Sequence, residues 1–230
     1  MNIFQNYAAR YERTREEEYS LQEYLEICKR DRLAYASAAE RMLAAIGEPE
    51  MVDTRNDSRL SRIFSNKIIK IYPAFREFYG TEEVIEQVVA YFRHAAQGLE
   101  ERKQVLYLLG PVGGGKSSIA EKLKSLMERV PFYAIKGSPV NESPLGLFNE
   151  GEDGPILEAD YGIPRRYLRT IMSPWAVKRL HEFNGDINQF RVVKRYPSIL
   201  KQIAISKTEP GDENNQDISS LVGKVDIRAL

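Results

Sequence analysis

The run GPVGGGKS, from Gly110 to Ser117, has the spacing G-x-x-x-x-G-K-[ST] of a phosphate-binding loop. Glycines allow backbone N–H groups to surround a polyphosphate, because they leave no side chains in the way and accept unusual φ angles. The lysine supplies a positive charge to the β- and γ-phosphates, and the serine hydroxyl is placed to bind Mg²⁺. The motif therefore predicts a site for ATP, or for another purine nucleoside triphosphate, with Ser117 as the metal ligand.

The flanking residues contain the elements that must position this loop. The apolar run from Val105 to Leu109 predicts a strand that is covered on both faces, as in a parallel sheet. A helix is expected from Lys116 and a second strand from Phe132 to Ile135. Strand, helix and strand form a βαβ unit, so we predict an α/β fold with a parallel sheet. The predicted nucleotide-binding residues here are Gly110, Pro111, Val112, Gly113, Gly114, Gly115, Lys116, Ser117 and Ser118.

The residues before the loop divide into two parts. Apolar residues at helical spacing predict helices over most of the first 60 residues, with a capping box from Ser20 to Glu23 and a stop at Gly47. The polar stretch 48–60 is interpreted as a linker. Thr81 is expected to cap a further helix. We therefore predict an N-terminal helical region, residues 1–60, and a nucleotide-binding module, residues 61–230.

Weaker patterns follow the βαβ unit. Residues 137–154 are rich in glycine, proline and asparagine and predict a long mobile loop. Ser173 and Pro174 predict a helix start, and Val192 and Val193 a strand. The range 164–201 contains nine Lys or Arg but only two acidic residues. We interpret them as solvated surface that is balanced by the acidic loop 209–217, although a phosphate-contacting patch is the alternative.

Composition limits the classes of function. The chain has 33 basic and 33 acidic residues, so nothing in its overall charge points to nucleic acid or an anionic membrane as a partner. Cys28 is the single cysteine, which fits a reducing compartment and excludes a multi-cysteine metal site. The N-terminus is too charged for a secretory signal, and no apolar run is long enough to span a bilayer. We expect a cytoplasmic protein.

Several longer runs are distinctive: RLSRIFSNKIIKIYPAFREFYGTEEVIEQVV, LGPVGGGKSSIAEKLKSLMERVP, SPVNESPLGLF, IMSPWAVKRLHEF and TEPGDENNQDISSLVGKVDIR. With them the chain resembles the N-terminal part of the bacterial PrkA family over essentially its whole length. The resemblance implies an AAA-type P-loop ATPase module within a serine protein kinase linked to stress adaptation or sporulation. An ATP-dependent protease activity is also attached to the family.

The resemblance to AAA-type ATPases also implies which residues contact the adenine base of the nucleotide. In such proteins a segment like Phe78 to Glu82 lies against adenine and ribose, so Tyr79 and Gly80 join the candidate site. A turn with two core aromatic residues is the plainer interpretation. The family further implies a protein substrate, and AAA catalysis usually depends on a neighbouring subunit, so a homo-oligomer is expected.

The chain departs from the family pattern downstream of the loop. No apolar strand ending in Asp-Glu follows Lys116, so the carboxylates that would hold Mg²⁺ and polarise water are missing from the sequence. The kinase signatures are also absent. We interpret the chain as an incomplete module that binds ATP with little hydrolysis. Three functions stay open: a kinase, an ATP-dependent remodeller or protease, and a regulatory nucleotide-sensing module without catalysis.

Overall fold

The computed structural model describes residues 2–13, 15–111 and 113–206. The α-helices are α1 (Ile3–Arg13), α2 (Leu21–Arg30), α3 (Ala38–Ile46), α4 (Ser58–Phe64), α5 (Glu82–Ala96), α6 (Lys116–Met127), α7 (Gly154–Tyr161) and α8 (Pro174–Glu182). The strands are β1 (Glu17–Ser20), β2 (Glu50–Asp53), β3 (Ile68–Ile71), β4 (Phe132–Ile135) and β5 (Arg191–Arg195). The 3₁₀ helices used below are η1 (Arg32–Ala34), η3 (Pro73–Phe75), η5 (Pro144–Leu147) and η6 (Arg165–Leu168).

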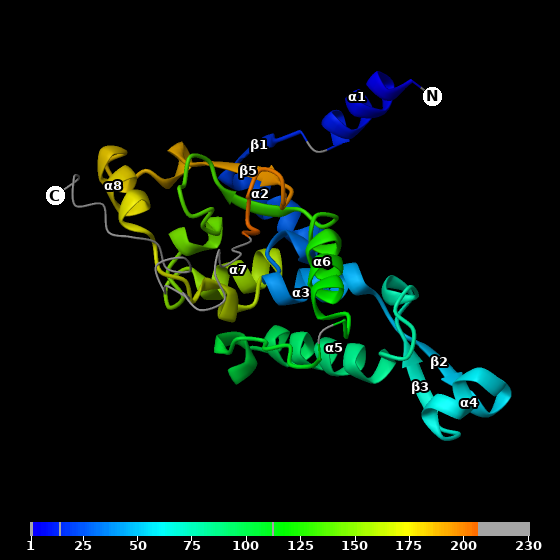
Figure 1. Cartoon of the computed structure of the whole chain (residues 1–230). Helices are drawn as coiled ribbons and strands as arrows, with labels where there is room; N and C mark the ends of the chain where they lie inside the picture. The colour runs from blue at the N-terminus through cyan, green and yellow to red at the C-terminus, as the bar shows by residue number, and fades with distance from the viewer. Residues whose placement is uncertain (1, 14, 112, 207–230) are drawn as a thin grey trace, which may run out of the picture.

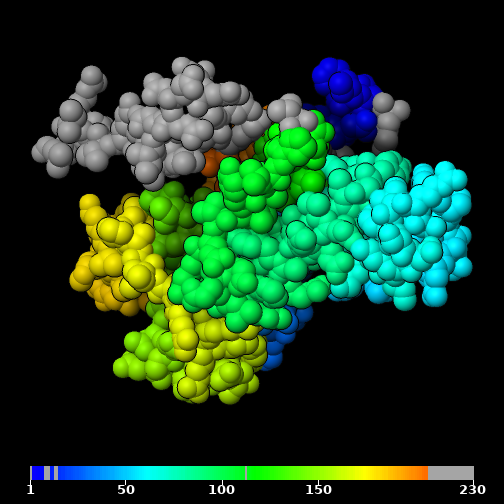
Figure 2. All heavy atoms as spheres, turned by 60° about the horizontal axis from the view of Figure 1, so that its bottom comes forward, coloured from blue at the N-terminus to red at the C-terminus, as the bar shows by residue number. Residues whose placement is uncertain are grey.

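The elements surround two main apolar clusters. In one, α2 packs with α7, η5, η6 and β5 around Tyr24 and Ile163, both completely buried. In the other, α3, α5, α6 and η3 meet around Leu126, also completely buried. The β2–β3 pair and α4 form a lobe at one end of the molecule, far from α8 at the other (Figures 1 and 2). Helix α1 projects from the body of the molecule, and its Phe4 is exposed.

Helix ends follow the sequence signals closely. Ser20 and Glu23 form both hydrogen bonds of a capping box at α2. Gly47 ends α3 with a φ of 78°, a left-handed angle that glycine adopts without strain. Ser173 caps α8 by accepting from the N–H of Ala176. Thr81 is the N-cap residue of α5, as predicted, but its side chain makes no capping hydrogen bond to the helix.

The strand pairing corrects the prediction of a parallel sheet. Among the described residues, β1–β5, β4–β5 and β2–β3 all pair antiparallel. Strand β4 was expected to lie parallel to residues 105–109, but β5 occupies its edge instead. The protein is therefore a mixed helical and antiparallel-strand structure, consistent with an α/β class at the coarse level.

Residues 105–109 were predicted to be a doubly covered strand, and this prediction is wrong for the described structure. They pair with no strand of the described part, although Leu106 and Leu108 pack against the cluster around Leu126. Val105, Tyr107 and Leu109 point outward and are 89%, 78% and 84% exposed. An apolar run becomes a doubly buried strand only where neighbours cover both of its faces, and here one face is covered.

Two expected loops also carry structure. The interpreted linker 48–60 contains β2 and the start of α4, because Glu50–Asp53 pair with Ile68–Ile71. The predicted mobile loop 137–154 contains no strand and meets α7 only at its last residue, Gly154, but η5 places Leu145 in the core and anchors this segment. The acidic loop 209–217 lies outside the described residues. Each of the two sheets contains residues from both sides of position 60. The division into a helical region, 1–60, and a nucleotide-binding module, 61–230, stays a prediction.

Candidate nucleotide-binding site

The predicted phosphate-binding loop lies at the surface and leads directly into α6. Gly113 and Gly115 have φ angles of 81° and 76°, which non-glycine residues seldom adopt. The N–H of Gly114 donates to the carbonyl of Pro111 at 3.2 Å and closes a tight turn. A Cβ built on Gly114 would lie 3.1 Å from that carbonyl oxygen, so the turn suits glycine there. Val112, also predicted to bind nucleotide, lies outside the described residues.

The start of α6 presents its first N–H groups without a side-chain cap. Gly115 is the N-cap residue and has no side chain to accept from the first turn. Ser117 and Ser118 are exposed on this turn, which is where the predicted Mg²⁺ ligand and a phosphate contact must lie. A helix N-terminus with unused N–H donors favours anions through both hydrogen bonding and the helix dipole.

Lys116 is folded back onto the loop. Its Nζ donates to the carbonyl oxygens of Gly110 at 2.7 Å and Pro111 at 2.6 Å. These bonds hold the ammonium group inside the loop, beside the N–H groups of the helix start. A phosphate oxygen that entered the loop would replace these neutral acceptors with a charged one, which adds the attraction between opposite charges to the hydrogen bonds of the ammonium group.

The rest of α6 fixes the loop to the body of the protein. Ile119, Leu123 and Leu126 are buried on one face of this helix and pack into the cluster that includes Phe75 and Ile85. The loop is thus exposed while the helix that carries it is anchored by apolar contacts. This combination gives a rigid support for a flexible ligand-contacting segment.

The segment with Tyr79 and Gly80 is brought to α6 by an ion pair. Lys122 of α6 contacts Glu77 with 2.7 Å between Nζ and Oε1. Gly80 has a φ of 78°, and the Tyr79 ring is 76% exposed, with the Arg59 guanidinium 5.7 Å from its centroid. The tyrosine is therefore free to face a ligand, whereas the plain interpretation as two core aromatics holds for Phe78 alone, which packs on Phe75.

A cavity of about 260 Å³ adjoins this segment. Tyr79, Phe78, Glu82 and Ile85 are among its lining residues. The Glu82 Oε2 and Thr81 Oγ1 atoms are buried and have no hydrogen-bond partner among the described residues. Buried polar atoms normally have partners, and Glu82, which lines the cavity, offers its Oε2 as an acceptor to a ligand with hydrogen-bond donors. The position of Thr81 and Glu82 beside Gly80 was visible in the sequence, but their burial was not.

Ser117 is the predicted Mg²⁺ ligand, and the described residues contain no group of three or more His, Cys, Asp or Glu side chains arranged to hold a metal ion. No helix within the described ranges is long and apolar enough to cross a membrane.

A glycine loop that opens a helix, with a lysine and a serine at its first helical positions, defines the class of P-loop nucleotide-binding proteins. Comparison of the sequence with known protein families identifies one family within this class. The profile of the family described as "PrkA AAA domain" matches residues 19–230. The chain belongs to the PrkA AAA domain family.

Named relatives agree with this assignment. The "Serine/threonine kinase YeaG" of Escherichia coli K12 is 69% identical over 100% of this chain and 36% of that protein. The "ATP-dependent protease PrkA" of Bacillus subtilis strain 168 is 34% identical over 95% of this chain and 34% of its own length. The chain thus spans about a third of the curated relatives it matches. No solved structure matches it significantly.

Proposed function

We propose that this chain is the ATP-binding part of a serine/threonine protein kinase of AAA type. The observation that carries the proposal is the loop from Gly110 to Ser117, whose lysine ammonium and free helix N–H groups meet at one exposed point. The 69% identity to a protein named as a serine/threonine kinase supports the reaction class. Tyr79, Gly80 and the unpartnered Glu82 carboxylate would contact the base and ribose.

The nucleotide is ATP and the ion is Mg²⁺ in this proposal. Lys116 would bind the β- and γ-phosphates, the loop N–H groups would surround them, and the Ser117 hydroxyl would hold the ion. Bound Mg²⁺ supplies charge neutralisation between the phosphates. The residues present fit these groups, because the Lys116 ammonium and the exposed serine hydroxyls adjoin the same helix start.

Replacement of Lys116 tests ATP binding. Lys116→Ala removes a charge-assisted hydrogen bond worth about 1.5–3 kcal/mol, so the Kd for ATP should rise about 10- to 150-fold. Calorimetric titration of the full chain with Mg·ATP measures this. Lys124→Ala is the matched control, since this lysine is on the same helix, pairs with Glu121 and lies two turns from the loop. Equal ATP affinity in the wild type and Lys116→Ala would refute the assignment.

A second candidate function rests on the relative named as an ATP-dependent protease. The two functions differ in what happens to a protein substrate. Transfer of a labelled γ-phosphate to serine in the whole protein supports the kinase. Loss of casein that requires ATP hydrolysis, without phosphoprotein, supports the protease.

We also propose a cytoplasmic homo-oligomer that acts on a protein substrate, in stress or sporulation signalling. The family supports the oligomer, because an AAA-type site usually needs a neighbouring subunit. A lone buried cysteine suits a reducing compartment. Native mass measurement with and without ATP tests the assembly.

A further inference from the structure

Two adjoining cavities lie on a different part of the molecule, between the start of α3, the end of α5 and η6. Their volumes are about 450 Å³ and 400 Å³, and both are lined by Glu40 and Arg166. We call the two together the arginine groove, after its arginines: Arg32, Arg41, Arg93, Arg102, Arg166 and Arg169. Glu40 is the single carboxylate in its lining, although the whole chain carries equal numbers of basic and acidic residues.

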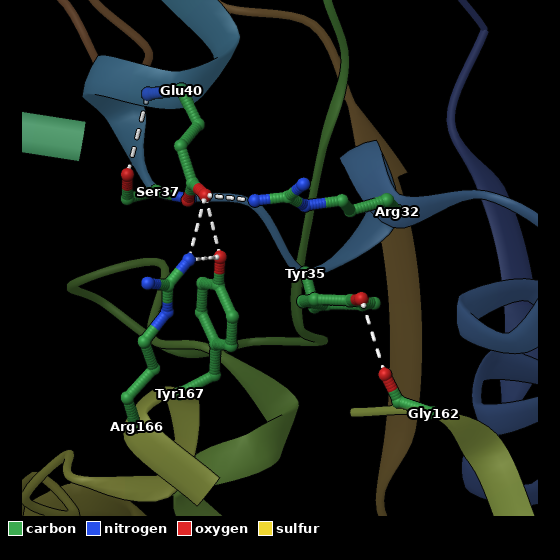
Figure 3. A network of polar contacts seen from close by, with 7 residues as sticks. All are labelled: Arg32, Tyr35, Ser37, Glu40, Gly162, Arg166 and Tyr167. Atoms are coloured by element: carbon green, nitrogen blue, oxygen red, sulfur yellow. Dashed lines mark hydrogen bonds and ion pairs between the residues drawn. The ribbon is translucent and has the colours of Figure 1, made fainter. Parts of the chain in front are cut away.

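The Glu40 carboxylate is already fully engaged (Figure 3). Its Oε2 accepts from the Ser37 N–H at 2.8 Å, and its Oε1 accepts from the Tyr167 hydroxyl. The same Oε1 pairs with Arg32 at 3.1 Å and with Arg166 at 3.4 Å. One negative charge is thus shared by two guanidinium groups, and it does not neutralise the remaining arginines.

Those remaining arginines have few counter-charges. Arg169 pairs with Glu150 at 2.8 Å, at the outer end of the groove. Arg93 and Arg102 are exposed and have no ion pair with any described residue. Counted over the described residues, the groove therefore keeps an excess of positive charge, whereas the whole sequence is neutral.

Arg41 gives the groove a buried cation. Its Nη1 donates to the carbonyl of Ala36, and its Cζ lies 5.7 Å from the centre of the Phe132 ring. Its Nε is buried with no acceptor among the described residues, and burial lowers the pKa of this guanidinium. A buried charged donor without an acceptor is unfavourable. A bound anion would supply the hydrogen-bond acceptor that the described residues do not offer to the Arg41 Nε.

The remaining lining indicates the kind of anion. Ser143 and Thr170 bring hydroxyl groups to the cavity that Arg41 lines, and Tyr133 and Tyr167 bring aromatic rings. Planar guanidinium groups bind phosphate oxygens in pairs of hydrogen bonds, and hydroxyl groups complete such sites. Each cavity has the volume of a small-ligand site. We propose that the arginine groove binds a small phosphate-bearing molecule, separately from the phosphate-binding loop.

Inorganic pyrophosphate is the probe for this site. The phosphate-binding loop would also take pyrophosphate, so the titration uses the full chain with Lys116→Ala as background. Physiological ionic strength screens binding to scattered surface charges. We expect saturable binding by calorimetry, weakened at least 5-fold by Arg102→Gln and abolished by Arg41→Gln together with Arg102→Gln. Arg62→Gln on α4 is the control for the loss of one exposed arginine and should leave affinity unchanged.

Several results would overturn the proposal. One is a lack of pyrophosphate binding at millimolar concentration in the Lys116→Ala background. Another is binding that Arg62→Gln weakens as much as Arg102→Gln does. A third is saturable binding of a phosphoserine peptide without binding of pyrophosphate, which would assign the groove to a protein partner. Arg102 is exposed and unpaired, so Arg102→Gln should fold normally, and circular dichroism checks this.

Discussion

Replacement of Glu40 by alanine is the perturbation whose effect the structure defines best. This side chain connects the start of α3 to η6, which lie 126 residues apart, and it is 11% exposed. It accepts from the Ser37 N–H in a capping box and from the Tyr167 hydroxyl, and it pairs with Arg32 and Arg166 (Figure 3). Removing it disconnects all of these contacts in one step.

The expected loss of stability follows from these contacts. Loss of one half of a capping box costs about 1 kcal/mol. A hydrogen bond from a hydroxyl to a largely buried carboxylate contributes about 1.5 kcal/mol. Arg32 and Arg166 are 68% and 47% exposed, so water replaces Glu40 around them and each pair contributes less than about 1 kcal/mol. Glu40→Ala should therefore lower the free energy of unfolding by about 3 kcal/mol, or Tm by about 6–12 °C.

Because Glu40 is ionisable, the loss of stability in Glu40→Ala should depend on pH. Burial alone would raise its pKa, but hydrogen bonds from Tyr167, Ser37 and Arg32 outweigh burial and lower the pKa overall. A carboxyl with a depressed folded-state pKa stabilises the protein above its unfolded-state pKa, which is about 4.3. This contribution disappears as the pH falls through the folded-state pKa. The stability difference between wild type and Glu40→Ala should thus be full at pH 7 and shrink below about pH 4.

Urea denaturation followed by circular dichroism at pH 7 and in the acid range measures both effects. Glu158→Ala is the matched control, because Glu158 pairs with Arg165 at 3.2 Å but both side chains are about half exposed. That substitution should change stability by less than about 1 kcal/mol. If Glu40→Ala costs no more than Glu158→Ala at pH 7, the network in Figure 3 does not connect the two segments as reasoned here.

Two further predictions concern chemistry in solution. The purified chain should bind ATP yet turn it over well below about 1 per second, the low end for typical enzymes; a faster phosphate release in a coupled assay, abolished by Lys116→Ala, would contradict this. Burial raises the pKa of the Cys28 thiol to about 12, so iodoacetamide at pH 8 should label it far more slowly in the native chain than in urea. Equal labelling rates would show that Cys28 is not buried in the cluster that α2 forms with α7 and β5.

The helix ends were predictable from the sequence because their signals are local. Ser20 with Glu23 and Ser173 with Pro174 each act within one turn, and the structure confirms both. Gly47 ends α3 for the same reason, since a left-handed φ is a property of one residue. Thr81 shows the limit of this reasoning, because it occupies the predicted N-cap position without making the capping hydrogen bond. Its hydroxyl is buried away from the helix N–H groups, and burial is set by the packing around it.

Strand partners were not predictable, because they depend on residues far away in the chain. Strand β5 lies between β1 and β4, so Val193 is opposite both Glu18 and Ala134. Hydrophobic runs such as Phe132–Ile135 indicate a strand but not the direction of its neighbour. The run Val105–Leu109 indicated two covered faces, and the described structure covers one. An apolar run indicates that a segment can be buried as a strand. Which segments lie beside it depends on the rest of the fold.

The same distinction separates the two candidate sites. The phosphate-binding loop is contiguous, so a motif of eight residues identified it, although the hydrogen bonds of Lys116 to the loop carbonyls were not visible there. The arginine groove is assembled from segments between Arg32 and Arg169, and each segment alone looks like ordinary charged surface. Arg166 and Arg169 belong to the basic stretch 164–201, and its predicted balance by the acidic loop 209–217 stays a prediction because that loop lies outside the described residues. The excess of positive charge in this groove is detected by asking which carboxylates each arginine pairs with. Within the described residues Arg41 forms no ion pair, although the charge of Glu40 acts on it.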